Sequence, residues 1–404
     1  MQFKAYPSYK NSAVEWLGDV PSDWHIKRFG YIFSENKRKN RGLIENNVLS
    51  LSYGNIKEKN VEDNKGLLPE SFETYQLIEP KDIIFRFTDL QNDKRSLRSA
   101  ISNYKGIITS AYISVRTQQN AEYFNYLFRA YDLKKVYYSM GDGMRQSLKI
   151  DELNRMPITV PNQRIQTQIA NFLDQETAKI DTLIAKQEKL IELFKENIIA
   201  LAMSEQIHGK GKLMRLCNIV EEIHRPTQLI EKEEYVALGL YNRGRGLFHK
   251  PSTLGQDMGD SDFFYVNSGD LILSGQFAWE GAVAMASNNE CGCVVSHRYP
   301  VLRGSLVNTE YLFALFMTDY GNYLLNDSSR GSAGRNKPLN TNILLKHKIR
   351  MPSKEVQEKI KTMLEKKLKL EIKVHEVIEK LKEYRASVIS NAVTGKIDVR
   401  ELVV

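Results

Sequence analysis

Apolar residues recur at intervals of three and four positions over two long stretches of the chain, residues 169–201 and 360–392. A seam of this kind, flanked by charged residues, is typical of long helices that wind around one another. The alternative is two independent amphipathic helices, each lying on its own domain, but the identical register of the two stretches favours mutual pairing. The apolar positions of the predicted seams are Ile169, Leu173, Ile180, Leu183, Leu190, Phe194, Ile360, Leu364, Val374, Ile378, Leu381 and Val388.

The two stretches belong to an internal repeat. Pro352 follows Pro161 by 191 residues, and the same offset aligns the segments around both prolines without a gap. Weaker matches continue upstream at offsets of 187 to 188, where residues 81–84 align with residues 269–272. The sequence therefore predicts a tandem duplication, in which each copy holds a globular part followed by a long helix.

The globular parts combine strand-like and helical patterns. Short aliphatic runs bounded by Gly, Asn or Asp predict strands, for example at residues 82–85 and 270–273. Apolar residues at core spacing predict helices over residues 121–136 and 309–325. The expected fold class is therefore mixed α/β, with two globular α/β domains and two long helices.

Composition restricts the class of protein. The 404 residues include 57 Lys and Arg against 49 Asp and Glu, a formal net charge of +8, and this balance permits contact with a polyanion. No apolar stretch approaches the roughly 18 residues of a membrane span. The N-terminus lacks an apolar secretory segment, and the three cysteines do not form a disulfide framework pattern. These features predict a cytoplasmic protein with no membrane partner.

No catalytic motif stands out in the sequence. A DNA methyltransferase needs a glycine-rich turn and an Asn-Pro-Pro-Tyr type motif, and neither is present; residues 331–338 lack the spacing of a phosphate-binding loop. Cys291, Cys293 and His297 form a C-x-C-x3-H run, but a structural zinc site needs four ligands at other spacings, so buried thiols are the favoured interpretation. The sequence thus predicts no catalysis, no cofactor and no metal.

Three segments carry a family resemblance. Residues 16–24 read WLGDVPSDW, residues 161–174 read PNQRIQTQIANFLD, and residues 383–400 read EYRASVISNAVTGKIDVR. In this order they resemble the DNA specificity subunit of type I restriction-modification systems, and the resemblance covers essentially the whole chain.

The resemblance implies two target-recognition domains, residues 1–160 and 209–351, that each read half of a split duplex DNA sequence. It also implies an antiparallel coiled-coil pair with pseudo-twofold symmetry, formed by a central spacer helix at residues 161–208 and a C-terminal spacer helix and tail at residues 352–404. Methyltransferase subunits, two in number, would bind the spacer, and motor-nuclease subunits would join the full complex. The chain itself would be non-catalytic, with the spacer length setting the gap between half-sites. A coiled-coil adaptor without DNA recognition, or a self-sufficient restriction or modification enzyme, are the alternatives.

Candidate DNA contacts lie in loops, because sequence readout needs Arg, Lys, Asn or Gln side chains on backbone that can approach a duplex closely. Residues 141–147 and 330–337 occupy corresponding places in the two copies, and the resemblance also places DNA contacts there. Residues 94–98, matched by the 276–280 loop, and residues 242–246 are further candidates. An ordinary solvated turn is the competing interpretation of each loop. The predicted contacts are Arg145, Gln146, Ser147, Arg335, Asn336, Lys337, Lys94, Arg95, Arg98, Arg243 and Arg245.

Overall fold

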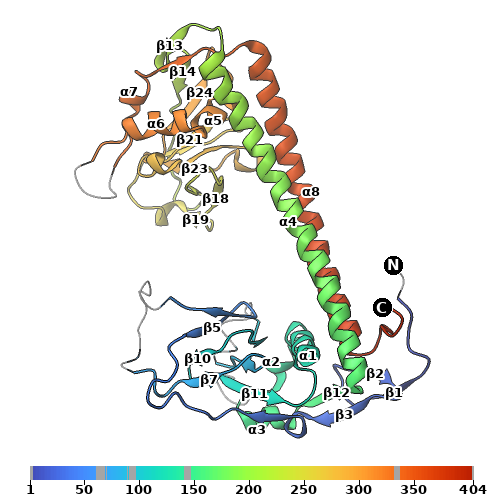
Figure 1. Ribbon diagram of the computed structural model, residues 1–404. Coiled ribbons are helices and arrows are strands. Elements are labelled where there is room, and N and C mark those ends of the chain that lie inside the picture. Colours follow the sequence, from blue (N-terminus) through green and yellow to red (C-terminus); the bar gives the residue numbers. More distant parts are fainter. Residues whose placement is uncertain are drawn as a thin grey trace. The chain divides into compact units, whose positions relative to one another are not determined.

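The chain divides into two compact units, each combining an α/β domain with one end of each long helix (Figure 1). The computed structural model describes residues 3–60, 69, 71–88, 90, 97–140, 147–331 and 337–402. The first unit holds Met1–Ala185 and Val377–Val404, and the second holds Lys186–Glu376. The long helices are α4 (Gln163–His208) and α8 (Lys354–Val393). Each of them therefore contributes its two halves to different units.

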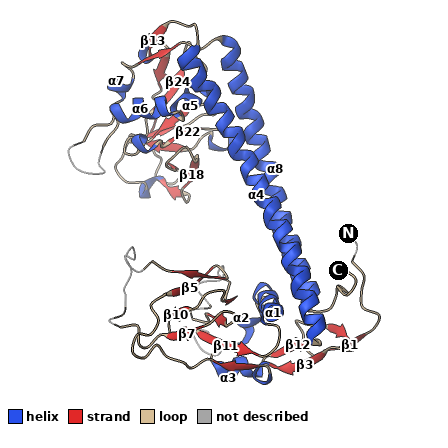
Figure 2. Ribbon diagram, in the orientation of Figure 1, coloured by secondary structure: helices blue, strands red, loops and turns tan. Residues whose placement is uncertain are grey.

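Both units are built on a four-stranded antiparallel sheet with the same strand order. Figure 2 shows strands and helices combined in each unit. In the first unit the order is β4 (Phe33–Glu35), β11 (Ile113–Thr117), β8 (Ile83–Phe85) and β9 (Ser99–Ile101). In the second unit it is β14 (Val220–Glu222), β24 (Val301–Gly304), β21 (Leu271–Leu273) and β22 (Val283–Met285). This identity confirms the predicted α/β class and the internal repeat.

Shorter strands and helices complete each unit. The first unit adds β1 (Tyr9–Asn11), β2 (Asp19–Pro21), β3 (His25–Arg28), β5 (Leu49–Ser52), β6 (Asn55–Glu58), β7 (Gln76–Ile78), β10 (Gly106–Ile108), α1 (Ala121–Leu133), α2 (Val136–Met140), α3 (Ile150–Arg155) and β12 (Pro157–Val160). The second unit adds β13 (Leu213–Arg215), β15 (Pro226–Thr227), β16 (Glu234–Tyr235), β17 (Leu238–Leu240), β18 (Leu247–His249), β19 (Thr253–Leu254), β20 (Phe263–Tyr265), β23 (Val294–Ser296), α5 (Thr309–Phe316), α6 (Asp319–Asp327), α7 (Thr341–Leu344) and β25 (Lys348–Arg350).

The helix predicted over residues 309–325 is two helices. Thr318 interrupts it: its hydroxyl accepts a hydrogen bond from the Gly321 amide at 3.0 Å and so caps the start of α6. In the first unit, α1 ends at Leu133, three residues before the predicted end, and Lys135 adopts a φ of +60° between α1 and α2. At both places a polar cap or a residue with positive φ ends the helix, although the apolar spacing continues along the sequence.

A buried aspartate organises each sheet. The carboxylate of Asp82 accepts hydrogen bonds from Arg116 of β11, and the Nε–Oδ1 distance is 2.5 Å. Asp270 takes the same place in the second unit, where Arg303 of β24 donates at 2.5 Å and Arg225 donates at 2.6 Å. Burial alone would raise the pKa of Asp270, but hydrogen bonds from Arg225, the Asn267 amide and Arg303 outweigh it and hold this pKa below its ordinary value.

A buried glutamine joins each long helix to the short helix of its domain. The side chain of Gln166 donates to the Pro161 carbonyl at 2.8 Å and accepts from the amide of Asn120, the residue that caps α1, at 3.2 Å. Gln357 in the second repeat donates to the Pro352 carbonyl at 3.1 Å and accepts from the Asn308 amide at 2.7 Å. The repeated proline and glutamine positions therefore fix the start of α4 and of α8.

The two long helices pair antiparallel in each unit (Figure 1). In the first unit, where α4 begins, the hydroxyls of Tyr123 and Thr159 donate to the carbonyl of Val393 at the end of α8. In the second unit, where α8 begins, Tyr311 donates to the carbonyl of Ala202 near the end of α4 at 3.4 Å. Each domain is thus completed by the end of the helix that follows the other domain in sequence.

The predicted seam residues of α8 are buried or half-buried, whereas two predicted seam residues of α4, Leu183 and Leu190, are exposed. Leu183 and Leu190 are 46% and 44% exposed, and the neighbouring Ile184 and Ile191 are more protected. In α4 the protected residues run Leu173, Thr177, Ile180, Ile184, Gln187, Ile191, Phe194 and Ile198. The sequence cannot distinguish the two registers, because each exposed leucine stands directly beside an isoleucine that fits the other register equally well.

The chain termini meet in the first unit. Gly395 adopts a φ of +73°, and a Cβ on it would lie 2.3 Å from Pro21, so glycine is required on both counts. The buried residues Ile397 and Val399 join the core that contains Trp24. The N-terminal and C-terminal segments that carry the family resemblance are therefore in contact with each other.

None of the helices in the described ranges is both long enough and apolar enough to cross a membrane.

Replacing Asp270 by Asn should lower the free energy of unfolding by about 2 kcal/mol or more. A fully buried pair would cost roughly 3–5 kcal/mol, and the partial exposure of both arginines reduces this figure. Because the pKa of Asp270 is lowered, its contribution is complete above pH about 4 and is lost as the pH falls through that pKa. Denaturant unfolding at pH 7 and pH 3 measures the difference, and Asp260→Asn, at an exposed position, is the control.

The seam register of α4 is tested by two alanine substitutions in the second unit. Ile198 is fully buried, so Ile198→Ala should cost about 2–5 kcal/mol. Leu190→Ala should cost less than about 1 kcal/mol, because Leu190 already faces solvent. Thermal unfolding of both variants decides between the registers: equal losses would support the predicted seam over the observed one.

Candidate nucleic-acid interface

Three loops of the second unit meet at one surface. The amides of Arg243 and Gly244, in the loop between β17 and β18, donate to the carbonyls of Glu280 and Gly281 at 3.0 and 2.8 Å. The amide of Leu339 donates to the Gly275 carbonyl at 2.8 Å. These bonds join residues 241–246, the turn between β21 and β22, and the segment that follows α6. All three were predicted separately as candidate DNA-binding loops.

Cationic side chains lie on aromatic rings at this surface. The guanidinium carbon of Arg245 is 5.2 Å from the ring centroid of Tyr241, and the ammonium of Lys337 is 5.1 Å from that of Trp279. Tyr241 is itself exposed. Cations supply affinity for phosphates, and aromatic faces can stack on bases or sugars. Cations and aromatic rings that lie together on three anchored loops are suited to binding nucleic acid.

The hairpin loop of the second unit is held in a defined shape. Arg243, Gly244 and Gly246 all adopt positive φ, at +61°, +61° and +96°. The side chain of Asn242 donates to the carboxylate of Glu280 on the neighbouring loop. This bond and the two backbone bonds fix the loop, so that Arg243 and Arg245 project into solvent from a pre-organised backbone.

The corresponding hairpin of the first unit is tighter. Tyr53 and Gly54 form a two-residue turn with φ of +48° and +72°, which is the positive-φ pair of a type I′ turn. Tyr53 is 74% exposed, and Arg129 of α1 donates to the Gly54 carbonyl at 2.6 Å. Tyr53 precedes Tyr241 by 188 residues, so the repeat offset could have identified both exposed tyrosines, which the sequence analysis missed.

The predicted contact Arg98 is corrected by the structure. Its side chain is fully buried, its guanidinium donates to the Thr88 carbonyl at 3.2 Å, and its amide donates to Asp132. A phosphate cannot reach it without opening the domain, so Arg98 is an interior residue. A basic run in a loop does not reveal which of its members turns inward.

The other predicted contacts divide into two groups. Ser147, Arg243 and Arg245 are exposed and Lys337 is half-buried on Trp279. Lys94, Arg95, Arg145, Gln146, Arg335 and Asn336 lie outside the described residues. The structure therefore brings together Arg243, Arg245 and Lys337 on one surface, and they remain the candidate contacts of the second unit.

No metal centre is found within the described ranges, where no cluster of three or more His, Cys, Asp or Glu side chains could hold an ion. The prediction that the thiols are buried is wrong for Cys291, which is exposed together with Cys217. Cys293 is partly buried, and burial raises the pKa of its thiol. The exposed position of Cys291 follows from its place in a short turn before β23.

The repeated domain, the antiparallel helices and the basic, aromatic loops define a duplicated recognition protein suited to nucleic acid. A family model described as "Type I restriction modification DNA specificity domain" matches residues 21–193 and again residues 216–383. These two matches cover most of the chain. The chain therefore belongs to the type I restriction-modification DNA specificity family.

Solved structures are similar to this chain at low sequence identity. A chain from a study of complex assembly and conformational transition of the type I R-M system is 13% identical, with a TM-score of 0.62 over 94% of this chain and 99% of that one. The HsdS subunit from Thermoanaerobacter tengcongensis is 13% identical over 94% of this chain and 98% of its own, with a TM-score of 0.47. The S subunit from M. genitalium is 12% identical over 92% and 96%, with a TM-score of 0.40. No curated protein sequence matches this chain.

Proposed function

We propose that the chain recognises a duplex DNA site in two parts, one α/β domain for each part, and binds methyltransferase subunits on α4 and α8. The observation that carries this proposal is the repeated sheet with unlike loops. The hairpin loops of the two units differ in length and chemistry. So do the segments that connect β8 to β9 and β21 to β22, while the strand order is the same. One scaffold with two different reading surfaces suits a site with two unequal halves.

The charges of the second unit supply the expected chemistry of DNA binding. Arg243, Arg245 and Lys337 can donate to phosphates or to base edges, and Trp279 and Tyr241 add ring faces. The formal net charge of +8 favours approach to a polyanion over the whole chain.

Exposed apolar side chains on the long helices support a partner surface. Leu183, Leu190 and Leu193 on α4 are exposed, as are Leu368, Ile372 and Val377 on α8. Leu183 and Leu190 are seven residues apart and thus share one face of α4 beside the seam. Apolar side chains left in water at regular helical spacing indicate burial against another protein, and in this proposal that protein is the methyltransferase. The chain itself supplies no catalytic group to the reaction.

Methylation mapping tests this proposal as a whole. Cells that carry the chain with its cognate methyltransferase should show methylated sites with two fixed parts and a constant gap, and the purified chain alone should transfer no methyl group to DNA. Turnover by the chain alone would indicate a self-sufficient enzyme. If the chain binds only protein, and the affinity depends weakly on salt, it is an adaptor.

Removing one loop cation should weaken DNA binding in a salt-dependent way. Arg245→Gln and Lys337→Gln should each lower the slope of log affinity against log salt by about 0.9, because each removes one phosphate contact. Fluorescence anisotropy with a duplex that contains the mapped site, at several salt concentrations, measures the slope. Lys348→Gln, exposed on β25 and outside the three loops, is the control and should leave the slope unchanged.

Lengthening both helices should widen the gap between the two parts of the site. Seven residues inserted after Ala185 and seven after Glu376 keep the seam in phase and add about 10 Å to each helix. The gap should then grow by roughly one to three base pairs, since a base pair occupies about 3.4 Å, while the bases read stay the same. The same insertion after Gly259, in an open surface loop, is the control. An unchanged gap contradicts the role of the helices as a spacer.

A further inference from the structure

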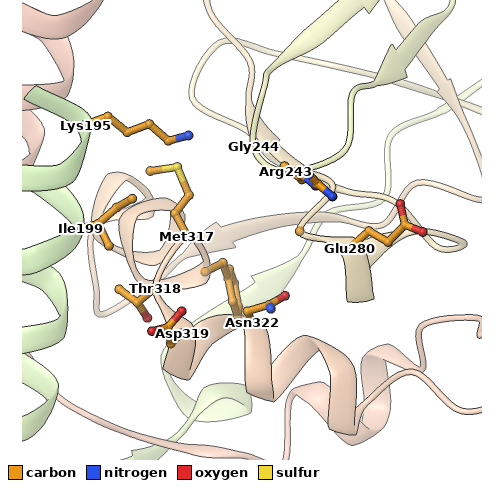
Figure 3. A pocket seen from close by; sticks show the side chains of 11 residues that line it. Lys195, Ile199, Arg243, Gly244, Glu280, Met317, Thr318, Asp319 and Asn322 are labelled. Atoms are coloured by element: carbon orange, nitrogen blue, oxygen red, sulfur yellow. The ribbon is translucent and has the colours of Figure 1, made fainter. Parts of the chain in front are cut away.

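A cavity recurs at corresponding places in the two units. In the first unit it has a volume of about 550 Å³ and lies among the β5–β6 hairpin, α1 and α8; in the second it has about 210 Å³ and lies among the β17–β18 loop, the end of α5 and α4 (Figure 3). Arg129 lines the first cavity and Met317, 188 residues later, lines the second. The glycine at each hairpin tip faces that residue: a Cβ on Gly54 would lie 2.2 Å from Arg129, and one on Gly244 would lie 3.4 Å from Met317.

The cavity of the first unit has a cationic lining. Arg129 of α1 and Lys382 and Arg385 of α8 contribute three positive charges, and no carboxylate is present among the described residues that line it. The amide side chains of Asn55, Asn103 and Asn125 also line it. The cavity therefore offers charged and neutral hydrogen-bond donors together.

The charge of Arg129 is only partly compensated. Burial lowers the pKa of its guanidinium, and Asp132 opposes this effect while the nearby charge of Arg385 adds to it. Its bond to the neutral Gly54 carbonyl satisfies one donor, and Asp132, three residues later on α1, acts on it as a nearby charge without forming an ion pair with it in the described ranges. Lys382 and Arg385, by contrast, each bind a carboxylate, that of Glu379 at 2.8 Å and that of Asp181 at 2.9 Å. A half-buried cation that forms no ion pair is costly unless an anion joins it.

The cavity of the second unit lacks this imbalance. Figure 3 shows Lys195 and Arg243 together with Glu280 and Asp319, so two positive and two negative side chains line it, and Met317 stands where the first unit has Arg129. The two repeats thus share the cavity and differ in the charge of the side chains that line it. The cationic lining is a property of the first unit rather than of the fold.

We propose that the cavity of the first unit binds a phosphate group, with Arg129 as its central ligand and Lys382 and Arg385 as further donors. A phosphate fits three cations better than a single carboxylate does, because it carries up to two charges and several acceptor oxygens. The cavity lies in the range of small-ligand sites and exceeds the size of a bare phosphate ion. Exposed Tyr53 at its edge offers a ring face to an organic body. A base attached to the phosphate could stack on this ring, so the ligand we propose is a nucleotide, either free or within a DNA strand.

Arg129→Met is the decisive variant, because the second repeat carries methionine at the corresponding position of the same cavity. Isothermal titration calorimetry of the full chain with inorganic phosphate, with AMP and with adenosine separates the contribution of the phosphate from that of the ring. We expect phosphate and AMP to bind and adenosine not to bind. Arg129→Met should weaken both bound ligands at least tenfold, and Arg155→Met, at an exposed arginine outside the cavity, should leave them unchanged.

A second variant separates ligand binding from support of the hairpin. Arg129→Met also removes the bond to the Gly54 carbonyl, whereas Lys382→Gln leaves the hairpin intact. Lys382→Gln should also weaken phosphate and AMP, by about threefold to tenfold, with an unchanged circular dichroism spectrum. If Arg129→Met fails to fold, this variant alone decides the question.

Duplex DNA distinguishes the two sources of the phosphate. If the site takes a DNA phosphate, Arg129→Met should lower the salt slope of DNA binding by about 0.9 even where AMP binds poorly. If it takes a free nucleotide, AMP binding is lost and the salt slope is unchanged. The proposal is overturned if neither AMP binding nor the slope responds to Arg129→Met and Lys382→Gln. A chain that binds AMP but no DNA would retain this site and contradict the function proposed above.

Discussion

The antiparallel pairing of α4 and α8 is the constraint on which both domains depend. In the first unit the core contains Ile169 and Leu173 from α4 together with Val388 and Ala392 from α8. In the second unit it contains Ile360 from α8 together with Ile198 and Ala202 from α4. Each domain thus buries apolar surface against the helix end of the other repeat, so neither repeat alone supplies all of its core. Tyr123 and Tyr311 add hydrogen bonds to carbonyls near the ends of α8 and α4, respectively.

The two repeats share the same scaffold and differ at the surface. The buried Asp82 and Asp270, the glutamines at the helix starts and the strand order are the same in both units, because each satisfies buried groups that cannot be left without partners. The hairpin tips face solvent and carry no such requirement, and the side chains that line the two cavities differ in charge. They have diverged from a two-residue turn to a six-residue loop and from Arg129 to Met317. A recognition protein needs this combination of a fixed frame and variable loops.

The same helices carry two kinds of apolar residue. Residues such as Ile180 and Ile198 lie in the seam, while Leu183 and Leu190 stand beside it and face solvent. The first kind stabilises the chain on its own, and the second remains available for another protein.

The sequence alone determined the duplication, the α/β class and the existence and pairing of the long helices, because a fixed offset and a heptad spacing are properties of residue order. It also located the loops that meet in the second unit. Only the tertiary structure decided the register of α4, since adjacent apolar residues such as Leu183 and Ile184 satisfy either seam until the partner helix selects one. It likewise buried Arg98 and placed Arg129, Lys382 and Arg385 around a cavity that no described carboxylate lines, because burial and the lining of a cavity depend on residues that are distant in sequence.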